Sequence, residues 1–204
     1  MASVDTSADA ASEVLIPELN DYRSQFEALK SETAQLLDGL TEEQFNWREN
    51  PGRWSIAECL VHLNVTARLY LPLIKSAMEE ARSRKLFNDG PFRHGFLVNW
   101  LIRTTEPPPK LKTKSPKIFV PPPDQPLATV ATEFMALQDQ FLAHIREANG
   151  LHLSRIKVIS PVSRFLRMSL GQSFAFLAAH ERRHLWQARE VKAGMKEQMS
   201  DAGC

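Results

Sequence analysis

Two histidines near the C-terminal end of the chain have the spacing of a metal site. His180 and His184 are four residues apart, and on a helix this separation puts both side chains on one face, roughly 6 Å apart. One metal ion can bridge that distance, and neutral imidazole is a ligand of zinc, nickel and iron(II). Such a pair also arises by chance, so its meaning depends on which way it faces.

The neighbouring residues indicate that the pair faces the protein interior. At about 100° per residue, the two histidines share one stripe with Phe176, Leu177 and Val191. His62 lies in a similar stripe of an earlier segment, with Val65, Thr66, Leu69 and Leu73. If these two helices face one another, three imidazoles meet at one site. A divalent ion held there keeps open positions and acidifies a bound water or thiol. The alternative is three ordinary buried histidines, each hydrogen-bonded to a backbone carbonyl.

The segment His180 to His184 also matches H-E-x-x-H, the helix signature of zinc proteases, in which the glutamate is the general base. The extended form of that motif needs a glycine at Gln187 and a histidine at Glu190, and the chain has neither. Glu181 also lies about 80° from the middle of the stripe. We therefore do not expect a protease.

Four segments with helical periodicity position these histidines. They run from about Pro17 to Asp38, from Ser55 to about Arg82, from Leu127 to Asn149 and from about Ser169 to Met195. The second begins most clearly, because Pro51-Gly52 breaks the chain, Ser55 suits the N-cap and Glu58 completes a capping box. A short turn beginning at Thr41 and a short helix from Phe92 to Arg103 are also predicted.

Residues 84–125 form a long connection between the second and third long helices. Eight of the thirteen prolines lie between Pro107 and Pro126, which predicts a stiff, extended crossover. No window shows the alternation and tight turn of a strand hairpin. The expected fold is therefore all-α, a four-helix bundle with one long Pro-rich crossover. We expect one domain over residues 1–204, with residues 1–15 as a flexible tail.

Composition excludes several classes of protein. The 25 basic and 24 acidic side chains leave a formal charge of +1, which argues against a nucleic-acid-binding protein. Nine basic residues between Arg82 and Lys117 lack interleaved aromatic residues suited to base stacking, so a solvated, lysine-rich linker is expected there. Two cysteines are too few for a disulfide framework, and no signal peptide or membrane-spanning segment is expected. We expect a cytoplasmic protein with no membrane partner.

Three segments together resemble the DinB-like (DinB/YfiT-like) metalloenzymes. The first contains Asn46-Trp47, Pro51 to Glu58 and Val61-His62-Leu63, and the second runs from Phe176 to Gln187. The Lys- and Pro-rich stretch from Lys110 to Pro123 adds a looser similarity. The resemblance extends from about Pro17 to Lys192, and its two histidine-bearing motifs are specific only in combination.

The resemblance implies a fold, a site and a class of chemistry. The family fold is an up-down-down-up four-helix bundle, and its metal triad maps onto His62, His180 and His184. Zinc or nickel is the expected metal, with iron as a further candidate. Family members often form homodimers, and the assigned reactions are mostly S-transfers or isomerisations with low-molecular-weight thiols such as bacillithiol or mycothiol. A hydrolase acting through bound water is a second possibility for the enzyme.

The competing interpretation is a non-catalytic bundle that binds a metal or a small ligand and has a stress-related role. No catalytic residue beyond the ligands is assigned from the sequence.

Several neighbouring residues have two interpretations each. Glu58 either orients His62 or only caps its helix, and Gln187 either orients a ligand or lies at a polar core edge. Arg183 either faces a carboxylate-bearing thiol or is solvated. Cys59 is either a ligand or a small buried apolar residue. Trp186 lies off the core stripe, which suggests a dimer contact or packing against the crossover.

Overall fold

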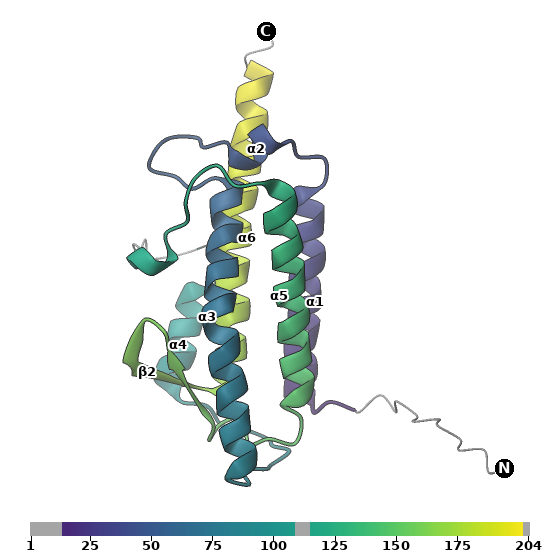
Figure 1. Ribbon diagram of the computed structural model, residues 1–204, viewed down its shortest axis with the longest axis vertical. Coiled ribbons are helices and arrows are strands. Elements are labelled where there is room, and N and C mark those ends of the chain that lie inside the picture. Colours follow the sequence, from purple (N-terminus) through teal and green to yellow (C-terminus); the bar gives the residue numbers. More distant parts are fainter. Residues whose placement is uncertain (1–13, 109–114, 202–204) are drawn as a thin grey trace, which may run out of the picture.

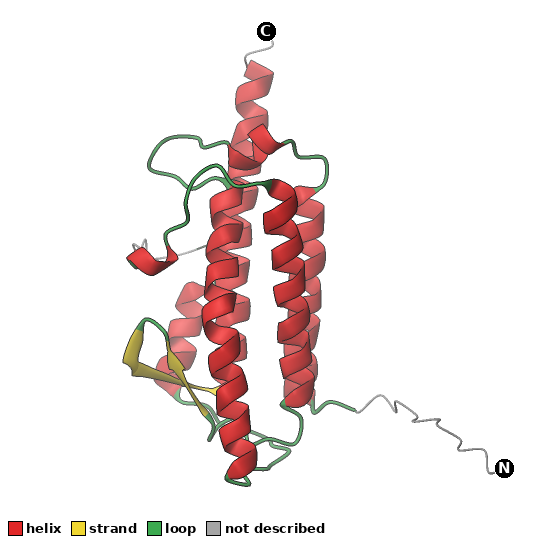
Figure 2. Cartoon of the chain, viewed as in Figure 1, coloured by secondary structure: helices red, strands yellow, loops and turns green. Residues whose placement is uncertain are grey.

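The computed structural model describes residues 14–108 and 115–201 (Figure 1). These residues are mostly helical, as the all-α prediction requires (Figure 2). The helices are α1 (Pro17–Leu37), α2 (Glu42–Asn46), α3 (Ile56–Ser83), α4 (Phe96–Thr105), α5 (Leu127–Glu147) and α6 (Leu170–Asp201), with a short 3-10 turn, η1 (Lys117–Phe119). Two short strands, β1 (Lys157–Ser160) and β2 (Ser163–Ser169), precede α6. None of the described helices is long and apolar enough to cross a membrane.

The long helices begin where local sequence signals predict. The Ser55 side chain accepts a hydrogen bond from the Glu58 backbone N–H at 3.1 Å, and the Ser55 N–H donates to Glu58 Oε2 at 2.9 Å. This is the predicted capping box, which satisfies two backbone donors that a helix start leaves unpaired. Pro17 occupies the first turn of α1, and Gly39, with φ at +70°, follows its end. The positions of these helix ends determine which side chains of α1 and α3 face the core.

The four long helices lie side by side along the long axis of the molecule (Figure 1). Helix α3 packs against α5 and α6, and α1 packs against the same two helices. Aromatic contacts join them in the core. The rings of Phe26 and Phe141 stack at 4.9 Å between α1 and α5, and Tyr22 lies 5.9 Å from Phe174 of α6. Since α3 and α6 are in contact, residues on their facing sides can share one site.

The connections differ from the prediction. Helix α4 begins at Phe96 rather than Phe92, because the side chains of Phe92 and His94 take part in tertiary contacts that hold this segment outside the helix. The hairpin formed by β1 and β2 was not predicted from the sequence, since its turn lacks an Asn-Gly or Asp-Gly signal. Helix α6 also extends past Met195 to Asp201.

The crossover is closer to the bundle than a free linker would be. Within its described part, α4 packs against α6 and η1 packs against α3. Residues 109–114 of this segment, like residues 1–13 of the predicted tail, lie outside the described residues. Leu15, the last residue of that predicted tail, packs against the hydrophobic core.

Candidate metal centre

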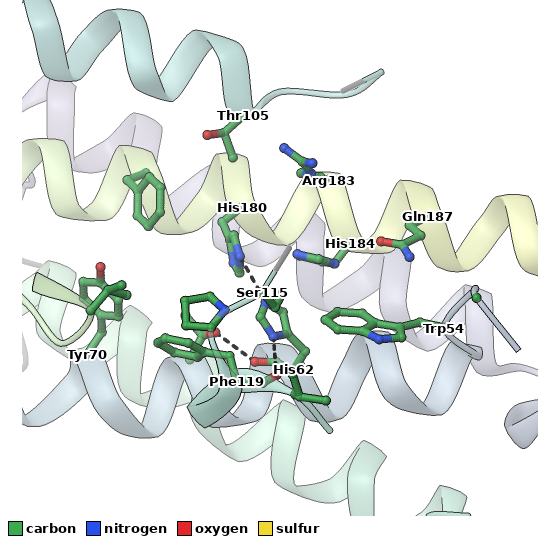
Figure 3. A pocket seen from close by; sticks show the side chains of 16 residues that line it. Trp54, His62, Tyr70, Thr105, Ser115, Phe119, His180, Arg183, His184 and Gln187 are labelled. Atoms are coloured by element: carbon green, nitrogen blue, oxygen red, sulfur yellow. Dashed lines mark hydrogen bonds between the residues drawn. The ribbon is translucent and has the colours of Figure 1, made fainter. Parts of the chain in front are cut away.

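The structure brings His62 of α3 together with His180 and His184 of α6 (Figure 3). One ring nitrogen from each histidine lies within 4.8 Å of the others. The ring of His62 is 5.1 Å from that of His180 and 4.5 Å from that of His184, measured between centroids. His62 and His184 are buried, with 4% and 7% of their surface exposed. The spacing of four residues on α6 therefore places both side chains toward α3, as predicted.

A backbone carbonyl orients His62. Its Nδ1 lies 2.8 Å from the carbonyl oxygen of Phe119, in the turn η1 of the crossover. Because a carbonyl oxygen only accepts hydrogen bonds, Nδ1 carries the proton and Nε2 has a free lone pair. That Nε2 lies 3.2 Å from Nε2 of His180. The lone pair of His62 is thus directed at the second histidine rather than at solvent.

Burial keeps the three imidazoles neutral. It lowers the pKa of His62, and it lowers the pKa of His180 to about 3, with further contributions from His62 and Arg183. Burial and the neighbouring histidines hold the pKa of His184 well below its usual range. The Nδ1 atoms of His180 and His184 are buried and have no hydrogen-bond partner within the described part of the chain. Neutral imidazole is the form that binds metal ions.

The donor set fits one divalent metal ion. Two imidazole nitrogens bound at about 2.1 Å to the same tetrahedral zinc ion are about 3.4 Å apart. The 3.2 Å separation between His62 and His180 is close to this value. Since all three nitrogens lie within 4.8 Å of one another, the longest pair has to close by at most about 1.4 Å. Three imidazoles are a ligand set of zinc, nickel and iron, so the set does not select among these metals.

A cavity of about 610 Å³ opens onto the three histidines. The Trp54 ring stacks on that of His184 at 5.7 Å and lies 5.0 Å from that of His62, and Phe176 stacks on His180 at 5.7 Å. These aromatic contacts fix the ring planes of the histidines. The other lining residues come from α3, the crossover, the hairpin turn and α6: Gly52, Thr66, Tyr70, Thr105, Ser115, Pro116, Phe119, Val120, Val162, Arg183 and Gln187.

Glu58 caps its helix and does not orient His62. Its carboxylate accepts two hydrogen bonds from the Arg48 guanidinium, at 2.7 and 2.6 Å, besides the one from the Ser55 N–H. The partner of His62 is instead the Phe119 carbonyl. A carbonyl on the crossover performs the role that the sequence suggested for this carboxylate.

Glu181 does not have the position of a protease base. Its side chain is buried on the α5 side, where Oε1 accepts a hydrogen bond from Gln138 at 3.1 Å. It is not among the cavity-lining residues, and burial raises its pKa to about 8. The H-E-x-x-H match therefore reflects the pair of histidines alone, in agreement with the angular argument from the sequence.

The remaining candidates differ in where the structure places them. Cys59 is completely buried, and burial followed by the charge of Glu58 raises the pKa of its thiol. It is part of the apolar core and does not belong to the histidine cluster. Arg183 and Gln187 line the cavity. Trp186 is half-buried.

Sequence reasoning missed two parts of the site. The sequence assigns Trp54 no role beyond membership of a family motif, although its ring contacts those of His62 and His184. The crossover was treated as a linker, although Phe119 supplies both a ring contact and the carbonyl that orients His62. The sequence signal for Trp54 is its position directly before Ser55, the N-cap of α3. No local signal indicates the role of Phe119.

Comparison with known families agrees with this geometry. The profile of the DinB superfamily matches residues 25–188, which include all three histidines and most of both helices that carry them. No curated protein and no solved structure matches the chain. The chain belongs to the DinB superfamily, as its two histidine motifs indicated.

Proposed function

We propose that this chain is a metal-dependent enzyme in which His62, His180 and His184 hold a divalent ion that activates a thiol or a water molecule. The observation that carries the proposal is the meeting of three neutral imidazoles in the wall of an open cavity. Zinc or nickel is the preferred ion, with iron as a further candidate. The preferred reaction is S-transfer with a low-molecular-weight thiol in the cytoplasm, where such thiols are kept reduced.

The bound ion would supply a Lewis acid that lowers the pKa of its thiol or water ligand. The chain's own residues position that chemistry. The Phe119 carbonyl holds the proton on Nδ1 of His62 and so directs Nε2 into the site. Trp54 and Phe176 restrict the imidazole planes and exclude water from one side of the cluster. Thr66 and Tyr70 line the same cavity, so a ligand there meets hydroxyl as well as apolar groups.

Metal analysis tests the site. The purified protein is expected to contain one equivalent of metal, and His62→Gln and His180→Gln are expected to reduce this to background, since each removes one of three ligands. Glu181→Gln is the matched control, because Glu181 is adjacent to His180 but lies on the α5 side. Equal metal content in all four proteins would refute the triad.

A screen of thiols with small electrophiles tests catalysis. Metal-loaded protein should accelerate loss of the free thiol, and the metal-depleted His180→Gln protein should not. If the metal is retained but no thiol in the panel reacts, the alternative is favoured, namely a non-catalytic bundle that binds a metal or ligand and has a stress-related role.

We also propose that the four long helices form the up-down-down-up bundle of the family as a single domain. The packing of α3 and α1 against the same two helices supports this arrangement. A homodimer is a further part of the proposal. Phe96, Leu97 and Trp100 of α4 are 80%, 75% and 53% exposed, and exposed groups of large apolar side chains mark interfaces.

Light scattering tests the dimer. The protein is expected to have twice the mass of the chain, and Trp100→Glu to shift it toward the monomer. Glu79→Lys, at an exposed position of α3, should leave the mass unchanged. A monomeric starting protein would contradict the proposal.

A further inference from the structure

The cavity extends beyond the three histidines along α3 and α6. Figure 3 shows Tyr70 at one end, Gln187 at the other, and His180 and His184 between them. On α3, Tyr70 follows His62 by about two helical turns. The cavity therefore has a part that lies between the histidines and Tyr70, which we call the Tyr70 arm.

Aromatic rings form a wall of the Tyr70 arm. The ring of Phe176, on α6, stacks on that of His180 at 5.7 Å and lies 6.2 Å from that of Tyr70. Val162, in the turn between β1 and β2, also lines the cavity. A flat apolar group that packs against Phe176 buries apolar surface there and makes aromatic contacts. Because Phe176 adjoins His180, such a group lies directly beside the metal centre.

Most hydroxyl groups of the cavity lining are already satisfied or hydrated. Thr66 donates to the carbonyl of His62 at 2.8 Å, and Thr105 donates to the carbonyl of Leu101 at 3.0 Å. Each threonine thus uses its only hydroxyl proton within its own helix. Ser115, on the crossover, is half-buried, so water reaches it. These three hydroxyls do not require a ligand.

The hydroxyl of Tyr70 differs from these three. Its oxygen lies 3.1 Å from Ser160 Oγ of β1, which accepts from the Val162 N–H at 3.3 Å. Tyr70 and Ser160 are only 2% and 4% exposed. Two hydroxyls carry two protons, and the bond between them uses one. The other proton has no acceptor within the described part of the chain.

This buried donor calls for a partner. Burial raises the pKa of Tyr70, so the phenol keeps its proton at neutral pH. Leaving a buried donor without an acceptor costs free energy, and an acceptor on a ligand removes that cost. Figure 3 shows the Tyr70 hydroxyl directed from α3 toward α6, at the end of the arm.

We propose that the Tyr70–Ser160 pair donates a hydrogen bond to the electrophilic co-substrate of the thiol, whose flat apolar part packs against Phe176. The inference rests on the proposed function and names the class of that substrate: aromatic or conjugated carbonyl compounds. In the complex, Ser160 donates to Tyr70 and Tyr70 donates to the carbonyl oxygen, and each bond polarises the next. A hydrocarbon of the same shape offers no acceptor and leaves the pair unsatisfied.

Two unreactive ligands of equal shape test the inference. They are para-fluoroacetophenone and para-fluoro-α-methylstyrene, which differ only in a carbonyl oxygen that replaces a methylene group. Fluorine NMR measures the dissociation constant of each from metal-free and from zinc-loaded protein. The ketone is expected to depend on the Tyr70 hydroxyl, and the alkene is not.

Tyr70→Phe isolates this hydroxyl, because it keeps the ring. It is expected to weaken binding of the ketone about three- to tenfold, the value of one neutral hydrogen bond, and to leave binding of the alkene unchanged. Tyr22→Phe is the matched control, since the Tyr22 hydroxyl donates to Glu18 and Tyr22 does not line the cavity. Unchanged binding of the ketone to Tyr70→Phe would overturn the inference. So would an equal loss of both ligands, which displacement of the hairpin from Tyr70 would produce.

Cobalt(II) tests where the ketone binds. Its unpaired electrons speed the relaxation of nearby nuclei, so the fluorine signal of the bound ketone should be broader in cobalt-loaded than in zinc-loaded protein. A bound ketone with equal line widths in both would contradict its position beside Phe176.

The outcomes separate the two proposals. The dissociation constants from metal-free protein decide the role of Tyr70 without any metal. A protein that takes up no metal would refute the triad and leave that result standing. A zinc-loaded protein whose ketone binding is unaffected by Tyr70→Phe would refute the role of Tyr70 alone.

Discussion

Within the described residues, the buried cluster around His62 and the partly buried cluster around His94 differ in how their ring nitrogens are satisfied. In the cluster around His62, one nitrogen is held by a carbonyl, and the nitrogens of His62 and His180 face one another. In the second cluster, His94 lies between α1 and the start of α6. Its Nδ1 is 2.8 Å from Ser169 Oγ, and its Nε2 is 2.8 Å from Glu18 Oε1.

The second cluster is closed by further contacts. Tyr22 donates a hydrogen bond to the same oxygen of Glu18 at 2.9 Å. The hydroxyl of Ser169 accepts from the Gln172 N–H at 3.2 Å, at the start of α6. Every nitrogen of the His94 ring has a protein partner, so this histidine joins three segments and has no capacity for a ligand. The difference teaches that a histidine enclosed by protein groups is not thereby a metal site. The candidate metal site is identified by ring nitrogens that face one another in the wall of a cavity.

The largest expected effect is the dependence of stability on metal. Because a ligand that binds only the folded state stabilises it, zinc at about one hundred times its dissociation constant should raise the free energy of unfolding by about 2.7 kcal/mol. His62→Gln should abolish this increment, and His94→Gln should retain it on a less stable protein. Urea unfolding with and without zinc measures both. Loss of the increment in His94→Gln would remove the distinction between the clusters.

A smaller effect is expected from Gly171 in the first turn of α6. A Cβ at this position would lie 2.6 Å from Glu18 Oε1 and 2.7 Å from His94 Cε1. Gly171→Ala should therefore displace the His94 ring and lower the free energy of unfolding by about 1–3 kcal/mol, with unchanged metal content.

Gly194, on the same helix, has no atom within 4 Å of such a Cβ, so Gly194→Ala should be neutral or stabilising by up to about 1 kcal/mol. Equal stability of the two variants would show that the His94 cluster tolerates displacement.

The smallest effect concerns His144, a histidine of α5 that lies near Glu147. Its Nδ1 lies 3.6 Å from Glu147 Oε2 and makes no hydrogen bond in the described structure. Burial lowers its pKa, Glu147 opposes this, and Lys75 and Arg82 add to the lowering. The unfolded chain therefore takes up this proton first as the pH falls below about 6.5. The resulting stabilisation is present above that pH and is lost as the pH falls toward the folded pKa.

His144→Gln should flatten the pH dependence of stability by at most about 1.4 kcal/mol per pH unit. Urea unfolding of metal-free protein between about pH 7.5 and about pH 5.5 measures the slope. An unchanged slope would show that His144 titrates alike in the folded and unfolded chains.

Local sequence signals were sufficient for the long helices and for part of the site. The Ser55–Glu58 capping box is formed by residues three apart, so the local sequence is sufficient to predict it. The same is true of the two histidines on α6, whose common face follows from helix geometry. The hairpin of β1 and β2 was missed, because its pairing is stabilised by packing rather than by a characteristic turn.

By itself, the sequence determined the mostly helical class, the starts of the long helices and the inward direction of three histidines, because each depends on residues close together in the chain. Only the tertiary structure decided what surrounds them. Phe119 is 57 residues from His62 in the chain, and Arg182 meets Glu106 across 76 residues while Arg183 lines the cavity. These pairings depend on the path of the crossover and on the packing of α4, and no local periodicity encodes that path.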